Sequence, residues 1–70
     1  MPNSAYKVIE IIGSSDTSWE KALQNAVDTA AESIKHPRVA EIKEQDATID
    51  EQGRITAYRV RVSLSFKYDR

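Results

Sequence analysis

The stretch ITAYRVRVSLSFKY, residues 55–68, decides the fold, because it alternates between two kinds of side chain along its whole length. Apolar and aromatic residues occupy every second position: Tyr58, Val60, Val62, Leu64, Phe66 and Tyr68. Arginine, serine and lysine stand between them. Side chains of a β-strand point alternately to the two faces of a sheet, so the pattern predicts a strand with one apolar and one polar face. Such a strand is far longer than the usual length of about 5–6 residues.

A helix is predicted over residues 18–35, where apolar side chains recur with the spacing of one helix face. The stripe that they form consists of Trp19, Ala22, Leu23, Ala26, Val27, Ala30 and Ile34. Thr17 and Glu20 match a capping box, so we expect the Thr17 hydroxyl to cap the first turn. His36 precedes Pro37, which disfavours the α conformation of His36 and ends the helix. Because many members of the stripe are alanines, the helix should lie close to the sheet.

Two further strands and a hairpin complete the order β–α–β–β. Residues 5–12 are rich in β-branched and aromatic types, and the turn signal at residues 13–16 ends this strand. Residues 38–46 predict a second strand, which a hairpin connection joins to the third, with a positive φ supplied by Gly53. Residues 1–4 form a polar lead that we expect to be frayed. The pattern predicts the α+β class, with one helix on one face of a three-stranded antiparallel sheet.

The composition allows one small domain over residues 1–70 and excludes several classes of protein. Ten Lys and Arg against eleven Asp and Glu give a net charge of −1, which argues against a nucleic-acid-binding module. No apolar run approaches the roughly 20 residues that span a bilayer, and no secretory signal is visible, so we expect a cytoplasmic protein without a membrane partner. With no cysteine for disulfides, a core of this size supplies only about 3–5 kcal/mol, so we expect an oligomer.

The polar face of the third strand is not a fully charged surface, since serines alternate there with arginines and a lysine. We expect Val39, and Ile9 or Ile11, to lie on the same side of the sheet. A mixed face of this kind suits a contact between subunits or a groove for a ligand.

Residues suited to catalysis are nearly absent. His36 is the sole histidine, and at the end of a helix it more often contacts terminal carbonyls than acts as a base. Ser14, Ser15 and Ser18 have no histidine near them in the sequence, and the two glycines form no phosphate-binding loop. Trp19 is expected as an anchor in the core or at an interface. We therefore expect a protein that is not an enzyme.

Acidic residues offer a candidate metal site near the end of the second strand. Glu44 and Asp46 lie two apart on a strand, hence on one face, and Asp50 follows in the connection with a further glutamate. Ca²⁺ and Mg²⁺ prefer oxygen ligands, and one chain offers few of them, so a neighbouring subunit or water would complete the shell. Two alternatives stay open: an ordinary solvated loop, or neutralisation of the two carboxylates by an arginine, Arg54 or Arg61.

Several segments, taken in order, resemble the dodecins. The sequence YKVIEIIGSS at residues 6–15, followed by TSWE at residues 17–20, is similar to the start of that family. AEI at residues 40–42, and YRV and VSLSF within residues 58–66, match its later parts. The resemblance runs over residues 5–68. It implies a β–α–β–β subunit whose sheet partly wraps its helix, assembled as a hollow homododecamer of tetrahedral symmetry.

Most dodecins bind flavins, and two flavin contacts of the family are substituted here. The residue that stacks on the flavin ring is a tryptophan before the Ala-Glu pair, and this position is Val39. The glutamine that hydrogen-bonds the flavin follows the tyrosine of the third strand, and this position is Arg59. Val39 has no aromatic face and Arg59 carries donors only, so the usual stacked flavin pair lacks both contacts.

Other segments are similar to a second branch of the family, the calcium dodecins. They are IIG, TSWE, RVA, EQD, GRIT and YR at residues 11–13, 17–20, 38–40, 44–46, 53–56 and 58–59. This similarity implies a bound calcium ion in the same dodecameric shell. It assigns no ligands, so Glu44 and Asp46 are candidates for the metal site from charge and geometry alone.

We therefore predict a non-enzymatic homododecameric shell that stores or buffers a small ligand or ion, with calcium as the leading ligand. The first alternative is a dodecin that holds flavin mononucleotide (FMN) or riboflavin in an altered pocket with Val39 and Arg59. The second alternative is a purely structural protein that assembles with itself.

Overall fold

The computed structural model describes residues 5–33 and 37–67, and its elements follow the predicted order. They are the strand β1 (Tyr6–Ser15), the helix α1 (Trp19–Ala31), and the strands β2 (Val39–Ile49) and β3 (Ile55–Lys67). The predictions for residues 1–4, Ile34, His36 and Tyr68 concern positions outside the described residues. Within the described ranges, no helix is long and apolar enough to cross a membrane.

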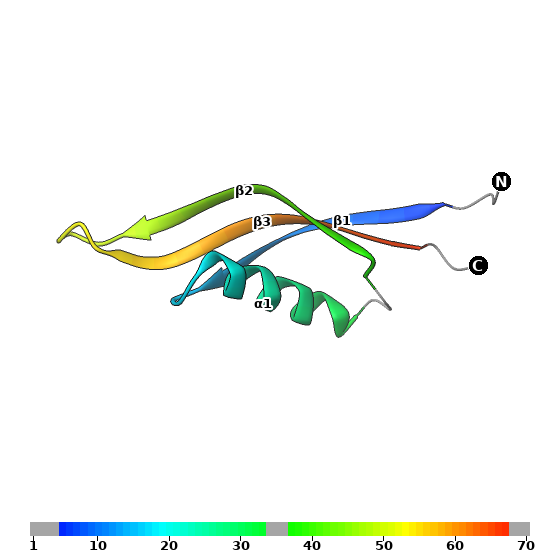
Figure 1. The fold of residues 1–70 in the computed structure, drawn as a ribbon, viewed down its shortest axis with the longest axis horizontal. Coiled ribbons are helices and arrows are strands. Elements are labelled where there is room, and N and C mark those ends of the chain that lie inside the picture. Colours follow the sequence, from blue (N-terminus) through cyan, green and yellow to red (C-terminus); the bar gives the residue numbers. More distant parts are fainter. Residues whose placement is uncertain (1–4, 34–36, 68–70) are drawn as a thin grey trace.

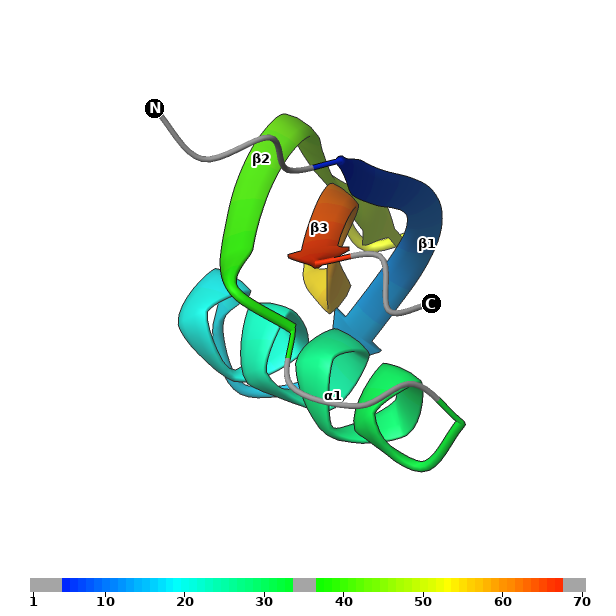
Figure 2. The same ribbon diagram turned by 90° about the vertical axis from the view of Figure 1, so that its right-hand side faces the viewer.

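The three strands form one antiparallel sheet in the order β1-β3-β2, with β3 in the middle. The sheet is curved: in Figure 2, β1 and β2 lie on either side of β3 and bend toward α1. In Figure 1, the hairpin of β2 and β3 extends past the start of α1, and the molecule is elongated, with extents of 55 × 21 × 14 Å. The predicted α+β fold, with a sheet that partly wraps one helix, is confirmed.

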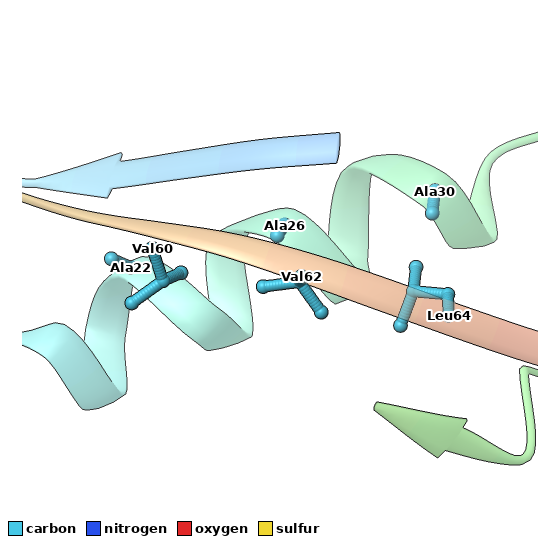
Figure 3. Packing of buried hydrophobic residues seen from close by; sticks show 6 residues of the cluster. All are labelled: Ala22, Ala26, Ala30, Val60, Val62 and Leu64. Atoms are coloured by element: carbon cyan, nitrogen blue, oxygen red, sulfur yellow. The ribbon is translucent and has the colours of Figure 1, made fainter. Parts of the chain in front are cut away.

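The core lies between α1 and the middle strand. Six buried side chains form it: Ala22, Ala26, Ala30, Val60, Val62 and Leu64. Figure 3 shows the three alanines at successive turns of α1, alongside the three apolar residues of β3. The apolar face of β3 thus packs on the helix, as the alternation predicts. Burial of a valine or leucine contributes only about 1.5–3 kcal/mol, so this core is small.

Gly13 allows the helix to approach the sheet. It is buried in β1, and a Cβ atom there would collide with the carbonyl oxygen of Ala22 and lie 2.8 Å from the Cβ of Ala26. The prediction that residues 13–16 form a turn is wrong at its start, because β1 continues to Ser15. Glycine serves here for the close approach of two elements and not for a bend in the chain.

Both ends of α1 differ from the prediction. Ser18, not Thr17, is the N-cap: its backbone is extended, and its Oγ accepts a hydrogen bond from the N–H of Lys21 at 3.0 Å. The Thr17 hydroxyl instead bonds the neighbouring aspartate at 3.1 Å. The helix ends sooner than predicted, at Ala31, because the N–H groups of Glu32 and the next residue donate to carbonyls three residues back and tighten the last turn.

The connection between β2 and β3 is a tight turn built on Asp50 and Gly53. Gly53 has a φ of 81°, as predicted, and its N–H donates to the Asp50 carbonyl at 3.0 Å. The Asp50 carboxylate accepts from the N–H groups of Gln52 at 2.9 Å and Arg54 at 3.0 Å. The carboxylate of Asp50 is therefore engaged in the turn, and β2 runs further than predicted, to Ile49.

We call the side of the sheet turned away from α1 the outer face. Val8, Ile12 and Val39 are apolar residues of this face, with exposed fractions of 58%, 62% and 60%. Val39 lies there as predicted. Ile9 and Ile11 do not, because they pair with buried residues of β3 and pack against the core. A shift of one position along a strand moves a side chain to the opposite face.

The substitution Gly13→Ala tests the close approach of α1 to β1. The added methyl group meets the backbone of α1, so we expect a loss of stability of about 3 kcal/mol, at the upper end of the usual range for an overpacked core. Ser14→Ala is the matched control, since Ser14 is adjacent and exposed and should change stability by about 0.5 kcal/mol or less. Equal melting temperatures of the two variants would contradict the assigned packing.

Candidate cation site

Two arginine–carboxylate pairs lie side by side on the outer face, between β3 and β2. The register places Asp46 opposite Arg59 and Glu44 opposite Arg61. Directly opposed residues of an antiparallel pair have Cβ atoms about 4.5–5.5 Å apart, so the opposite charges meet. All four residues are exposed. We call them the outer-face cluster.

A β-bulge in β2 brings both carboxylates to the outer face. Strict alternation would put Glu44 on the same side as Ile42, whose partner Val62 is in the core. The register shifts between Ile42 and Glu44, so that Lys43 is the extra residue and Glu44 joins Arg61 on the outer face. The prediction that the two carboxylates share one face is confirmed, and the bulge decides which face it is.

The pair of Arg59 and Asp46 is the better formed of the two. Nε and Nη2 of Arg59 donate to Oδ1 and Oδ2 of Asp46, both at 2.8 Å, in the two-bond geometry of strong guanidinium–carboxylate contacts. These hydrogen bonds, more than the nearby positive charges, hold the pKa of Asp46 below its usual value of 3.8. The same hydrogen bonds raise the pKa of Arg59.

The second pair is looser, with Nε of Arg61 at 3.5 Å from Oε1 of Glu44. About half or more of each of the four side chains in the cluster is exposed, and exposed ion pairs contribute little to stability. Neutralisation by arginine was one of the open alternatives. Arg61 takes this role for Glu44 as suggested, whereas Asp46 is paired with Arg59 and not with Arg54.

A hollow of about 30 Å³ opens beside the cluster. It is lined by Ile12, Glu44, Asp46, Arg59, Val60 and Arg61. A hollow needs roughly 10–15 Å³ to hold a water molecule, so this one admits a water molecule or an ion. A larger hollow, of about 360 Å³, lies between β1 and α1, but the described residues that line it carry no carboxylate. Of the two hollows, the smaller one has the ligand chemistry of a hard cation.

One chain does not complete a metal site. Within residues 5–33 and 37–67, no group of three or more His, Cys, Asp or Glu side chains could hold a metal ion. Glu44 and Asp46 offer two oxygens each, whereas Ca²⁺ takes about 6–8 oxygen ligands. A full coordination shell around these carboxylates therefore requires water or oxygens from another copy.

Val39 and Arg59 do not meet within one chain. Val39 lies opposite Ser65 at the start of β2, whereas Arg59 lies opposite Asp46. At a rise of about 3.3 Å per residue, Ser65 and Arg59 are about 20 Å apart along β3. A compact ligand that contacts both a Val39 and an Arg59 must therefore lie between two copies of the chain and take one residue from each.

Trp19 reaches the backbone of Asp46 from α1. Its Nε1–H donates to the carbonyl oxygen of Asp46 at 2.8 Å. Its ring meets that of Tyr58 edge to face, with the centroids 4.8 Å apart and an angle of 72° between the planes. The sequence predicts Trp19 only as a core or interface anchor. The hydrogen bond joins positions 27 residues apart, and no local sequence signal marks it.

Known proteins resemble the chain over nearly its whole length. The family model described as Dodecin matches residues 5–69. A protein named calcium dodecin from Mycobacterium tuberculosis is 52% identical over 64 residues, which cover 91% of this chain and 89% of that protein. A dodecin from Thermus thermophilus is 33% identical over 64 residues, or 91% of each.

A solved structure supports the same likeness. The crystal structure of the calcium dodecin from Mycobacterium tuberculosis, described as a calcium-chelating antigen with a novel calcium-binding site, matches with a TM-score of 0.81. The matched region covers 94% of this chain and 93% of that one, at 48% identity. The likeness therefore includes the whole β–α–β–β order.

The lowered pKa of Asp46 predicts a contribution to acid sensitivity. Since the pKa is depressed in the folded state, the ionised carboxylate stabilises the fold above pH 3.8, and this contribution is lost as the pH falls through the lower folded-state value. Between neutral pH and a pH below 3.8, the melting temperature of the parent should fall more than that of Asp46→Asn.

Asp28→Asn is the control for this pH series, because the Asp28 carboxylate accepts a hydrogen bond from Gln24 rather than from an arginine. It should follow the parent. Parallel pH profiles for the parent and Asp46→Asn would show that the pair with Arg59 does not affect stability.

Proposed function

Since the chain belongs to the dodecin family, we propose that it assembles as a hollow homododecamer that stores or buffers a small ligand, and that this ligand is calcium. The proposal gives the protein no catalytic role and no nucleic-acid or membrane partner. The identity of 52% to a protein named calcium dodecin supports the choice of ligand. The cytoplasmic location stays a prediction from the sequence.

The outer-face cluster carries this proposal. Glu44 and Asp46 place two carboxylates in adjacent cross-strand pairs, and carboxylate oxygens are ligands that calcium prefers. The hollow beside them has room for an ion. We propose that calcium binds here, with Glu44 and Asp46 among its ligands, and that water or a second copy supplies the remaining oxygens.

Calcium at this site competes with the two arginines. Arg59 donates two hydrogen bonds to Asp46, and Arg61 lies 3.5 Å from Glu44, so the ion must displace one or both guanidinium groups. Exposed ion pairs contribute little to stability, so a divalent cation can replace them. The competition lowers the affinity for calcium, which suits a protein that takes up the ion and releases it again.

Apolar surface that one chain leaves in water supports assembly. Large apolar side chains are exposed at Tyr6, Val8, Ile12, Val39, Ile42, Ile49 and Ile55. Soluble monomers rarely leave such residues in contiguous patches unless a partner covers them. Because the core of one chain is small, contacts with further copies would supply burial that the single chain lacks.

Calcium should raise the melting temperature of the parent in proportion to the logarithm of the free calcium concentration, because it binds the folded state. Glu44→Gln and Asp46→Asn each remove one charged ligand, so each should weaken calcium binding about tenfold or more in a calorimetric titration. Glu51→Gln is the control, because it removes an exposed carboxylate of the turn outside the cluster. It should bind calcium like the parent.

Two outcomes of this titration would count against calcium at the cluster. If the parent melts at the same temperature in calcium and in chelator, the protein does not bind the ion. If Glu51→Gln loses binding and the two cluster variants keep it, the ion is bound at the turn instead.

The second candidate function is flavin binding, with FMN or riboflavin held in an altered pocket. Val39 is 60% exposed on the outer face, so a tryptophan there would present its ring to a ligand. Val39→Trp combined with Arg59→Gln should strengthen flavin binding about two- to twelvefold, because an aromatic stack contributes about 0.5–1.5 kcal/mol. Quenching of flavin fluorescence measures the effect.

Val8→Trp combined with Arg59→Gln is the matched control, because Val8 is equally exposed and lies on the other side of Ser65 from Val39. It should not quench flavin more than the parent does. Equal quenching by the parent and the Val39 double variant would contradict the pocket. A protein that assembles but binds neither calcium nor flavin would be purely structural.

A further inference from the structure

Trp19 joins α1 to β2 by a side-chain hydrogen bond. The helix packs mainly on β1 and β3, and β2 is an edge strand with little contact to it. Among the described residues, the hydrogen bond from Trp19 Nε1 to the carbonyl oxygen of Asp46 is the one that joins α1 to β2. Pairing with Arg59 of β3 sets the place of Asp46 in the sheet, and the hydrogen bond from Trp19 adds a polar contact from the helix to its main chain.

The pairing of β2 with β3 is irregular on both sides of Asp46. The register shifts between Ile42 and Glu44, and again between Thr48 and Ile49. Bulges interrupt the hydrogen bonds between strands and bend the chain. Between the two shifts, residues 44–48 pair with residues 57–61 of β3 as a short run of five residues. Trp19 contacts this run at its middle residue.

Trp19 is itself well placed to act as a rigid donor. It is the first residue of α1, directly after the N-cap Ser18, and its side chain packs against the core. The edge-to-face contact with Tyr58 restrains the ring. The indole N–H therefore points in a defined direction, toward the main-chain carbonyl oxygen of Asp46.

We infer that Trp19 is a positioning residue for the cation site: by holding the main chain of Asp46, it determines where the Asp46 carboxylate stands on the outer face. This inference rests on the proposed calcium function and adds to it a residue that touches no ion. When calcium replaces Arg59, the carboxylate changes its partner, and the anchored main chain keeps it close to Glu44. Loss of the anchor should loosen this arrangement without removing a ligand.

The substitution Trp19→Phe tests the inference, because it keeps an aromatic ring against Tyr58 and removes the N–H. We expect calcium binding about fivefold weaker in a calorimetric titration, the effect of one net hydrogen bond. Asn25→Ala is the matched control. It also removes a side-chain hydrogen bond from α1 to a strand carbonyl, from Asn25 Nδ2 to Ser14 O at 2.9 Å, but that strand is β1. Its affinity for calcium should equal that of the parent.

Hydrogen exchange without calcium gives a second readout that does not depend on the ion. In Trp19→Phe, the amides of residues 44–48 should exchange faster than in the parent, whereas those of Asn25→Ala should not. Unchanged exchange in Trp19→Phe would overturn the inference, as would calcium binding equal to that of the parent or weakened equally in both variants. Absence of calcium binding by the parent would instead overturn the proposed function, and the exchange comparison would still decide whether Trp19 anchors β2.

Discussion

The whole structure depends on how closely α1 approaches the sheet. A narrow stripe of alanines faces the middle strand, and at Gly13 the helix backbone lies against a strand that has no Cβ atom there. Dense packing of this kind gains many weak contacts from little side-chain volume, so one short helix and one strand form the core. Because the helix lies on one face of the sheet and covers mainly β1 and β3, it leaves the outer face and much of β2 uncovered.

The fold could be predicted because two periodicities are clear in the sequence. The alternation over residues 55–68 identifies the central strand, and the alanine spacing identifies the helix that packs on it. The predictions are wrong at residues whose conformation depends on a neighbour in space rather than on the local sequence. Gly13 has the composition of a turn, and only the helix beside it explains a glycine within a strand. Thr17 and Ser18 are equivalent caps by composition, and the geometry of the first turn selects Ser18.

The candidate site could be predicted only in part, because it arises from strand register. Charge and spacing are sufficient to select Glu44 and Asp46. The partner of Asp46 is not predictable in this way, since a bulge invisible to simple alternation places it opposite Arg59. The hydrogen bond from Trp19 is harder still to predict, because it joins a helix to an edge strand distant in sequence. The two candidate carboxylates can thus be selected from the sequence, whereas the contacts that hold them cannot.

A crystal structure of the assembled protein with calcium, in which anomalous difference density identifies the ion, tests most directly whether the outer face holds the cation. We expect one calcium peak beside the cluster, with oxygens of Glu44 and Asp46 at about 2.3–2.6 Å from the ion and Arg59 displaced from Asp46. A calcium peak at the turn between β2 and β3, a peak between β1 and α1, or no peak at all would contradict the assignment of the cation to the outer face.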